Sequence, residues 1–201
     1  KGTIATNEKD LDIKQLSILL NGLLKDLDAK KVRLSSINNF SFNISKRFKL
    51  NNLNIESNVS LRQIVIKNNL SNLKLYLPDF NNNIKFKNHK IKINYNKEKL
   101  NIAGKGEVSI DDKSDFLNYE FLKKKDQFFF DTKINLKNKK LLVKFLNYEK
   151  DKGLDSSISI KGNFKKNNEI KFDLISLKEK NNKISVKKLN LNKDFKILSL
   201  N

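Results

Sequence analysis

The sequence of 201 residues contains no cysteine, methionine or tryptophan, and it has one proline and one histidine. Without cysteine the chain forms neither disulfide bonds nor thiolate metal sites. Cysteine usage therefore does not indicate whether the protein works in an oxidising or a reducing compartment. The one histidine, His89, stands in the polar stretch KNHK, where we expect an exposed turn rather than a catalytic base. We interpret the acidic pairs Asp10/Asp12 and Asp111/Asp112 as cap or turn residues rather than metal ligands. We therefore expect no enzymatic activity, no metal and no cofactor.

Long hydrophobic runs are missing too. No stretch reaches the roughly 18 consecutive apolar residues of a membrane-spanning helix, and no secretory signal opens the chain. Because there is no initiator methionine, we expect an excerpt of a longer or processed protein, with any anchor or export signal outside it. A chain of this length buries roughly 70% of its unfolded surface on folding, which suits a single module spanning residues 1–201.

Negative charge is scarce, with 22 Asp and Glu against 42 Lys and Arg and a formal net charge of +20. Proteins that bind nucleic acid usually gather their basic residues on one stripe and favour arginine. Here lysine is spread along the whole chain, and arginine occurs only at Arg33, Arg47 and Arg62. We interpret the abundance of Lys, Asn, Ile and Phe as the composition of an AT-rich genome, so nucleic acid is not an expected partner. Attraction to anionic surfaces such as phospholipid headgroups is the alternative.

One amphipathic helix is predicted near the start, over about residues 11–28. Apolar residues recur there at three- and four-residue spacing, and Asp10 is a plausible N-cap. The helix could cover an edge of a sheet, plug or gate a trough, or contact a bilayer surface. The apolar positions on its predicted face are Ile13, Leu16, Leu20, Leu23 and Leu27.

From Val32 to about Leu200, apolar and polar residues alternate, which predicts half-buried β-strands. Asn-rich turns separate these strands, so we expect antiparallel neighbours in a meander. Gly104-Lys105-Gly106 is interpreted as a bulge or bend. The alternating apolar positions are Phe40, Phe42, Ile44, Leu73, Leu75, Leu77, Ile91, Ile93, Tyr95, Leu100, Ile102, Val108, Ile110, Leu117, Tyr119, Phe121, Phe128, Phe130, Ile134, Leu136, Ile158, Ile160, Phe172, Leu174, Ile184, Val186, Leu189 and Leu191.

A sheet with one apolar face needs something across from that face. A second sheet, the helix, the sheet curling on itself or a bound ligand would each serve, and alternation alone does not choose among them.

Residues 104–200 carry a further pattern. GKGEVSIDDKSDFLNYEFLKKKDQFFFDTKINL combines a Gly-rich strand start with a Tyr- and Phe-rich strand pair. LLVKFLNYEKDKGLDSSISIKGNF adds a Tyr-Lys-Gly turn and a small-residue strand ending in glycine, and NKISVKKLNLNKDFKILSLN gives a closing strand pair. With Tyr148, Gly153, Gly162, Leu189 and Leu191 at the characteristic positions, this part resembles the bacterial AsmA-like family, particularly its YhdP and TamB branch. The first hundred residues resemble the family only in their alternation of apolar and polar residues.

The resemblance implies a mainly β fold, in which a long curved antiparallel meander sheet forms an open apolar groove, with one N-terminal amphipathic helix. Phospholipid acyl chains and neighbouring β-groove repeats of the same chain would be its partners. The polar residues Asp131, Lys133 and Asn135 would face water. The residues implied to line the groove are Ile91, Ile93, Tyr95, Val108, Ile110, Phe128, Phe130, Ile134, Leu136, Ile158, Ile160, Phe172, Leu174, Ile184 and Val186.

The function implied is intermembrane phospholipid transport and outer-membrane lipid homeostasis, as one module of a groove that crosses the periplasm. The chain would then be periplasmic and anchored in the bacterial inner membrane by a segment outside this sequence. The alternative from the residues themselves is a basic β-sandwich that binds or scaffolds a polyanion, either nucleic acid or an envelope polymer. The two hypotheses differ in whether a ligand or a second sheet covers the apolar face.

Overall fold

The computed structural model describes residues 1–13, 29, 31–67, 74–81, 83–110, 113–144, 147–165, 169–192 and 196–200, and within them the chain is mainly β. No helix in these ranges is long and apolar enough to cross a membrane. The strands are β1 (Gly2–Asp12), β2 (Lys31–Ile44), β3 (Leu50–Lys67), β4 (Asn83–Tyr95), β5 (Lys99–Ser109), β6 (Ser114–Lys124), β7 (Gln127–Asn135), β8 (Leu141–Val143), β9 (Tyr148–Lys150), β10 (Ser156–Lys165), β11 (Ile170–Glu179), β12 (Asn182–Leu191) and β13 (Ile197–Ser199).

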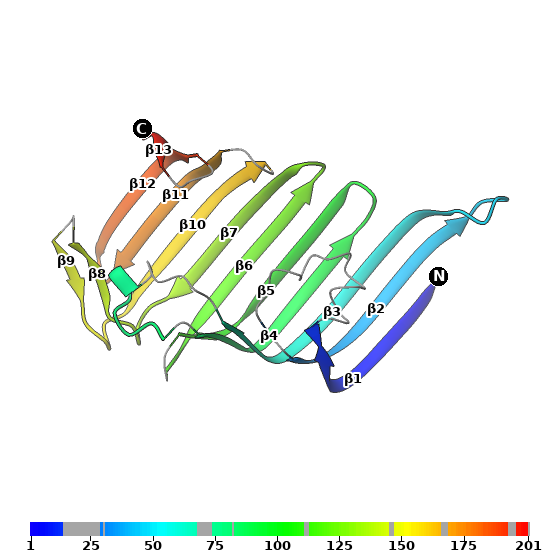
Figure 1. Ribbon diagram of the computed structural model, residues 1–201, viewed down its shortest axis with the longest axis horizontal. Helices are drawn as coiled ribbons and strands as arrows, with labels where there is room; N and C mark the ends of the chain where they lie inside the picture. Colours follow the sequence, from blue (N-terminus) through cyan, green and yellow to red (C-terminus); the bar gives the residue numbers. More distant parts are fainter. Residues whose placement is uncertain are drawn as a thin grey trace.

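Eleven of these strands form one antiparallel sheet in the order β1-β2-β3-β4-β5-β6-β7-β10-β11-β12-β13. The predicted meander is therefore confirmed. Figure 1 shows β1 at one edge of the sheet and β12 with β13 at the other. The remaining two strands, β8 and β9, pair with each other in the connection between β7 and β10.

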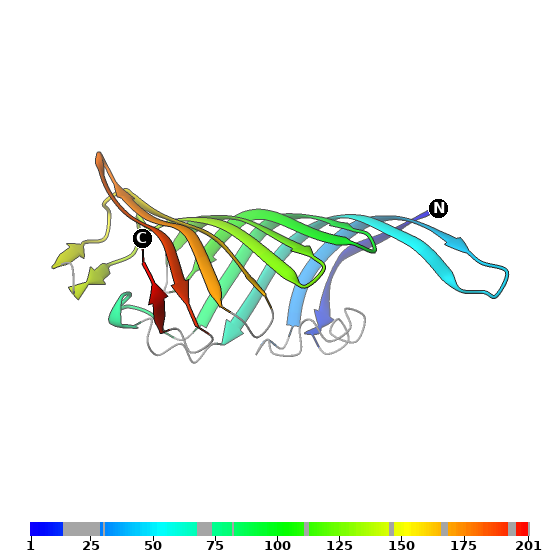
Figure 2. The same ribbon diagram turned by 90° about the horizontal axis from the view of Figure 1, so that it is seen from above.

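The large sheet is bowed. Seen from above in Figure 2, the two ends of β2 and β3 lie on the same side of their middles. Register shifts interrupt the strand pairing, for example between Lys87 and Lys90 on β4, and between Lys161 and Gly162 on β10. Asn88 and Lys188 adopt left-handed backbone angles, with φ of 53° and 52°. Such β-bulges bend and twist the strands that contain them, which accounts for the curvature.

The molecule exposes an accessible surface of 14267 Å². A compact monomer of 23.4 kDa exposes about 9,700 Å² by the usual scaling of surface with mass. The accessible surface is larger than this value because the eleven-stranded sheet is not covered on either face by a second layer of the same size.

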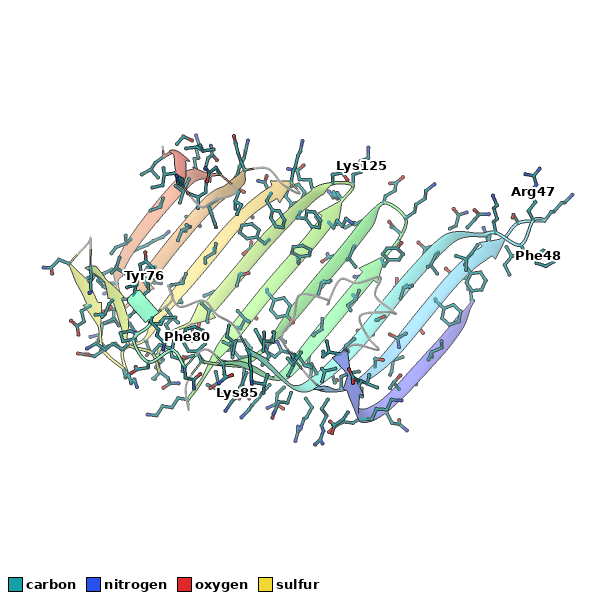
Figure 3. All side chains as sticks on the ribbon, in the orientation of Figure 1. Arg47, Phe48, Tyr76, Phe80, Lys85 and Lys125 are labelled. Atoms are coloured by element: carbon teal, nitrogen blue, oxygen red, sulfur yellow. The ribbon has the colours of Figure 1, made fainter. Side chains whose placement is uncertain are left out.

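The two ends of the strands differ. Short hairpins close one end, at β2–β3, β4–β5 and β6–β7, whereas the long connections β1–β2, β3–β4 and β7–β10 lie at the other end, together with the short turns β5–β6 and β11–β12. The buried apolar residues of the described chain all belong to this second end or to the connections beside it. Figure 3 places Phe80 there, near Tyr76 and the β8–β9 hairpin. These residues are Ile13, Val32, Phe80, Val108, Ile110, Leu136 and Leu141.

The predicted helix over residues 11–28 is wrong at its start, because Leu11 and Asp12 belong to β1. Residues 14–28 lie outside the described residues. The proposed N-cap, Asp10, is also part of β1, where its carboxylate accepts two hydrogen bonds from Arg33 on β2, at 2.8 and 3.0 Å. Strand formation over residues 2–12 was not anticipated, because its few apolar residues do not alternate regularly.

Three further predictions are wrong in detail. Leu75 and Leu77 lie in the connection between β3 and β4 rather than in a strand, since β4 begins only at Asn83, and Leu73 lies outside the described residues. His89 is not an exposed turn residue but lies within β4 with 1% of its surface exposed. The segment containing Gly104 is a regular part of β5, and the expected bulge is in the neighbouring strand β4.

Candidate functional site: the two faces of the sheet

The strand register places apolar side chains in rows that run across one face of the sheet, here called the apolar face. From β4 to β12 the two rows nearest the hairpin end contain one charged residue, Lys123, whose ammonium lies 5.5 Å from the ring centre of Phe128. The first row is Tyr95, Leu100, Lys123, Phe128, Phe164, Ile170 and Leu191, and the second is Ile93, Ile102, Phe121, Phe130, Gly162, Phe172 and Leu189.

Aromatic rings make contact along these rows. Phe128 stacks on Phe164 with ring centres 4.9 Å apart, and Phe121 lies 5.7 Å from Phe128. Phe130 meets Phe172 edge to face at 5.7 Å and lies 6.3 Å from Phe164. Offset and edge-to-face pairs of this kind stabilise the face by about 0.5–1.5 kcal/mol each beyond the area they bury. The aromatic residues thus form one connected surface over β6, β7, β10 and β11.

Two glycines allow this surface to pack closely. A Cβ atom at Gly162 would lie 2.8 Å from the Phe130 ring and 2.2 Å from the carbonyl oxygen of Lys171. A Cβ atom at Gly104 would lie 2.4 Å from the ring of Tyr119. Both glycines therefore leave room for the aromatic ring on the next strand, which is a role distinct from the bend predicted for Gly104.

The aromatic surface is half-buried rather than buried. Phe121, Phe128, Phe130, Phe164 and Phe172 all retain part of their exposure. At the rim of the same face, Tyr95 keeps 39% of its surface exposed and Ile184 also keeps 39%. Among the described residues no second sheet of comparable size lies across from it, since the strands outside the main sheet are β8 and β9 alone.

Most residues predicted to line a groove share this face. Five of them lie in the two rows given above, namely Tyr95, Phe128, Ile93, Phe130 and Phe172. Seven more lie in parallel rows on the same face, namely Ile91, Val108, Ile134, Ile158, Ile160, Ile184 and Val186. Leu136 lies two positions after Ile134 and one position beyond β7, where its backbone N–H donates a hydrogen bond to the carbonyl oxygen of Ser156. Ile110 follows the end of β5 and is 9% exposed.

Leu174 is on the opposite face. It pairs with Lys161 on β10 and with Lys187 on β12, whereas Phe172 pairs with Gly162 and Leu189. The residue between Phe172 and Leu174 forms a bulge and has no partner in the register. Leu174 therefore points to the face opposite Phe172, although the two residues are two positions apart. As predicted, Asp131, Lys133 and Asn135 lie on the face opposite Phe130.

Several residues of the apolar face were not among the predicted lining positions. Phe40, Ile55, Tyr119, Phe121 and Phe164 all lie in its rows. Phe40 and Phe121 carry the alternating pattern that marked the other positions. Phe164 follows Gly162 with the same spacing, so the alternation could have identified it as well.

The opposite face, here called the basic face, collects the lysines that are scattered along the sequence. From β4 to β12 its rows hold three acidic residues, Glu107, Glu120 and Asp131, against fourteen lysines. Lysines at alternating positions of a strand point to the same face of the sheet. Lysines that are far apart in the sequence therefore come together on one positively charged surface. These lysines are Lys85, Lys87, Lys90, Lys92, Lys99, Lys105, Lys124, Lys133, Lys161, Lys165, Lys171, Lys178, Lys183 and Lys187.

Three surface hollows, with volumes of about 520, 670 and 740 Å³, are lined chiefly from the basic face. The first lies over β3 to β7. The second lies over the connection end of β5 to β11, and the third near Arg33 and Arg62 on β2 and β3. Within the described ranges no three Asp, Glu or His side chains come together as a metal site.

The connection end of the sheet is held by buried polar groups. Asp115 and Lys139 form an ion pair at 3.4 Å, with side chains 2% and 4% exposed. Lys150 is fully buried, and its ammonium donates hydrogen bonds to the carbonyl oxygens of Lys139 and Asp151, at 2.6 and 2.9 Å. Burial lowers the pKa of Lys150, against nearby carboxylates that raise it. These contacts fix the β8–β9 hairpin to the main sheet.

Tyr148, at the start of β9, adds a contact to β11, where its hydroxyl donates a hydrogen bond to Glu179. Burial, followed by the hydrogen bond and the charge of Glu179, raises the pKa of Tyr148 to about 12. Burial also raises the pKa of Tyr119, on the apolar face.

The chain matches no protein-family model, and no curated protein or solved structure matches it significantly.

Proposed function

We propose that this protein is a lipid-carrying module, in which phospholipid acyl chains cover the apolar face of the bowed sheet. The observation that carries the proposal is the half-exposed aromatic surface over β6, β7, β10 and β11, centred on Phe128, Phe130, Phe164 and Phe172. Contiguous apolar surface of this kind on a protein marks a binding site for a lipid or another partner.

Acyl chains suit this surface chemically. They need no hydrogen-bonding partner, and the two rows nearest the hairpin end offer few polar groups between β4 and β12. Burial of one CH₂ group contributes about 0.8 kcal/mol, so a chain of about 16 carbons gains on the order of 12 kcal/mol. The hydrophobic effect is therefore sufficient for binding without a specific polar contact.

The open architecture supports the transport reading of the same proposal. Among the described strands, the sheet ends at β1 on one side and at β12 with β13 on the other, so pairing at these edges can extend a continuous apolar path into neighbouring β-groove repeats. On this proposal the module belongs to a periplasmic bridge between the inner and outer membranes that carries phospholipid, as the resemblance to the AsmA-like family implies.

The direct test is native mass spectrometry of the 201-residue chain purified without detergent, together with lipid extraction of the same sample. We expect phospholipid to remain bound through gentle ionisation and to be recovered in the extract. A lipid-free protein, which also takes up no fluorescent phospholipid from vesicles, would contradict the proposal.

A second candidate function is supported by the basic face. Fourteen lysines against three acidic residues from β4 to β12 suit attraction to a polyanion, either nucleic acid or an envelope polymer. This function leaves the apolar face unexplained, which is why we place it second. Tight binding of a polyanion by a protein that carries no lipid would reverse the order.

A further inference from the structure

The most central hollow of the basic face lies over β3 to β7 and has a volume of about 520 Å³. In one of the rows that cross it, Ala103 stands between Lys92 on β4 and Glu120 on β6. A methyl side chain is far shorter than the side chains of its neighbours, so the surface dips at this position. We call this depression the Ala103 hollow.

Four lysines line the Ala103 hollow, namely Lys90, Lys92, Lys105 and Lys133. All four are exposed, and none takes part in the ion pairs found among the described residues. Lys90 and Lys105 face each other directly across β4 and β5. Like charges in this arrangement destabilise a strand pair, and an anion bound between them would remove the repulsion.

The acidic residues of the hollow already have other partners. Asp131 forms an ion pair with Lys161 at 3.6 Å. A carboxylate oxygen of Glu120 accepts a hydrogen bond from the Asn101 amide at 3.0 Å. The ammonium groups of Lys90 and Lys105 are therefore not neutralised from within the hollow, although both acidic residues moderate its charge.

We propose that the Ala103 hollow binds a phosphate-bearing ligand with two or more negative charges, held chiefly by Lys90, Lys92 and Lys105. Lysine binds phosphate as a point charge without fixed geometry, which fits a shallow site built from flexible side chains. The ligand can be a free phosphate compound or the phosphomonoester headgroup of a lipid at a membrane surface. The site lies on the face opposite the proposed acyl-chain surface, so this inference does not depend on the proposed function.

The first experiment is isothermal titration of the 201-residue chain with inorganic pyrophosphate at low salt. The test variant is Lys90→Gln/Lys105→Gln. Its control is Lys178→Gln/Lys183→Gln, which removes the same charge from another lysine pair that faces directly across two strands of the same face. We expect the test variant to weaken binding by about tenfold or more, as the loss of charge-assisted hydrogen bonds does. We expect the control to change affinity by less than about threefold, through long-range charge alone.

A second arm identifies the source of the phosphate. Sedimentation with vesicles of phosphatidylcholine containing phosphatidic acid, compared with phosphatidylcholine alone, tests the lipid headgroup. Binding that requires phosphatidic acid and is lost in the test variant assigns the site to headgroups, and binding of pyrophosphate alone assigns it to free phosphates. Both results support the inference.

Three results would overturn it. The protein could bind neither probe, or the two variants could lose affinity equally, which would mean diffuse attraction to the whole face. A single-stranded oligonucleotide bound more tightly than either probe would instead make this face a nucleic-acid surface. The co-purified lipid of the test variant is measured as well. If this variant loses pyrophosphate binding but keeps its lipid, the phosphate site and the acyl-chain surface are independent of each other.

Discussion

Phe128 on β7 and Phe164 on β10 stack with their rings 4.9 Å apart and within 9° of parallel, although 35 residues separate them along the chain. The pair exists because the β8–β9 excursion returns the chain to pair β10 with β7. Phe128 also contacts Phe121, and Phe164 contacts Phe130, which in turn contacts Phe172. The Phe128–Phe164 pair therefore links the aromatic rings of β6 to those of β11. The aromatic surface therefore depends on the packing at the connection end.

Phe130→Glu tests the apolar face. Phe130 is half-buried and sits beside Phe164 and Phe172, so a carboxylate there stays partly hydrated while it lies in the path of an acyl chain. We expect the variant to stay folded, with a loss of about 1–3 kcal/mol from the broken ring contacts, and to retain much less co-purified lipid. Thermal melting and lipid extraction measure the two effects.

Lys133→Glu is the control for this substitution. Lys133 lies on the same strand but on the basic face, and it is exposed. It should alter neither melting nor lipid content appreciably. A Phe130→Glu variant that unfolds, together with a wild-type chain that carries no lipid, would mean that the face is a closed protein core.

The buried ion pair of Asp115 and Lys139 should be strongly coupled. Replacing Asp115 with Ala leaves the ammonium of Lys139 buried without its carboxylate, and breaking such a pair costs about 3–5 kcal/mol of unfolding free energy. Because Asp115 also accepts a hydrogen bond from the Asn138 backbone, part of the loss is independent of charge. Urea denaturation of the Asp115→Ala, Lys139→Met and double variants gives the coupling energy.

Lys137 and Asp155 provide the matched exposed pair. Their charged atoms are 3.2 Å apart, but the side chains are 56% and 78% exposed. Removing either partner should change stability by less than about 1 kcal/mol, since solvent screens the interaction. Equal effects at the two pairs would contradict the argument that burial sets the difference.

Gly162→Ala should destabilise the sheet more than Gly104→Ala. The added methyl group at Gly162 would lie 2.2 Å from a backbone oxygen of Lys171, which cannot move without disturbing β11. At Gly104 the obstacle is the Tyr119 side chain, which can rotate away. We expect a loss of about 1–3 kcal/mol at Gly162 and a smaller loss at Gly104, measured by urea denaturation. The reverse order would contradict the contact geometry.

Tyr148 should ionise late in an alkaline titration. Its pKa is raised from 10.0 to about 12, so the folded state holds this proton more tightly than the unfolded state does. The corresponding stabilisation is complete below pH 10 and is lost as the pH rises through about 12. We expect absorbance at the tyrosinate band to show a step near pH 12 that disappears in Tyr148→Phe.

The same variant separates this effect from the titration of the lysines. Between about pH 10 and 12, the unfolding free energy of Tyr148→Phe should fall less steeply than that of the wild type, while the loss of lysine charge is common to both. Identical slopes would mean that Tyr148 has the same pKa in the folded and unfolded states.

The alternation of residues is a local property, and it determined much of the fold. Phe128, Phe130 and Ile134 alternate with polar neighbours, and the short Asn-containing turn at 96–98 joins adjacent antiparallel strands. Asn96 closes that turn by accepting hydrogen bonds from the backbone N–H groups of Glu98 and Lys99. Most strand positions from Val32 onward, the antiparallel meander and the face of most predicted lining residues follow from such patterns alone.

Only the tertiary structure decided where the alternation breaks and what each face collects. His89 and Leu174 follow bulges whose position depends on pairing with neighbouring strands, so their burial and face could not be predicted locally. The burial of Asp115 with Lys139 depends on a connection that folds back over the strand ends. Lysines that alternate along separate strands become one basic surface only when strand register aligns them, because register is a property of strand pairs and not of a single strand.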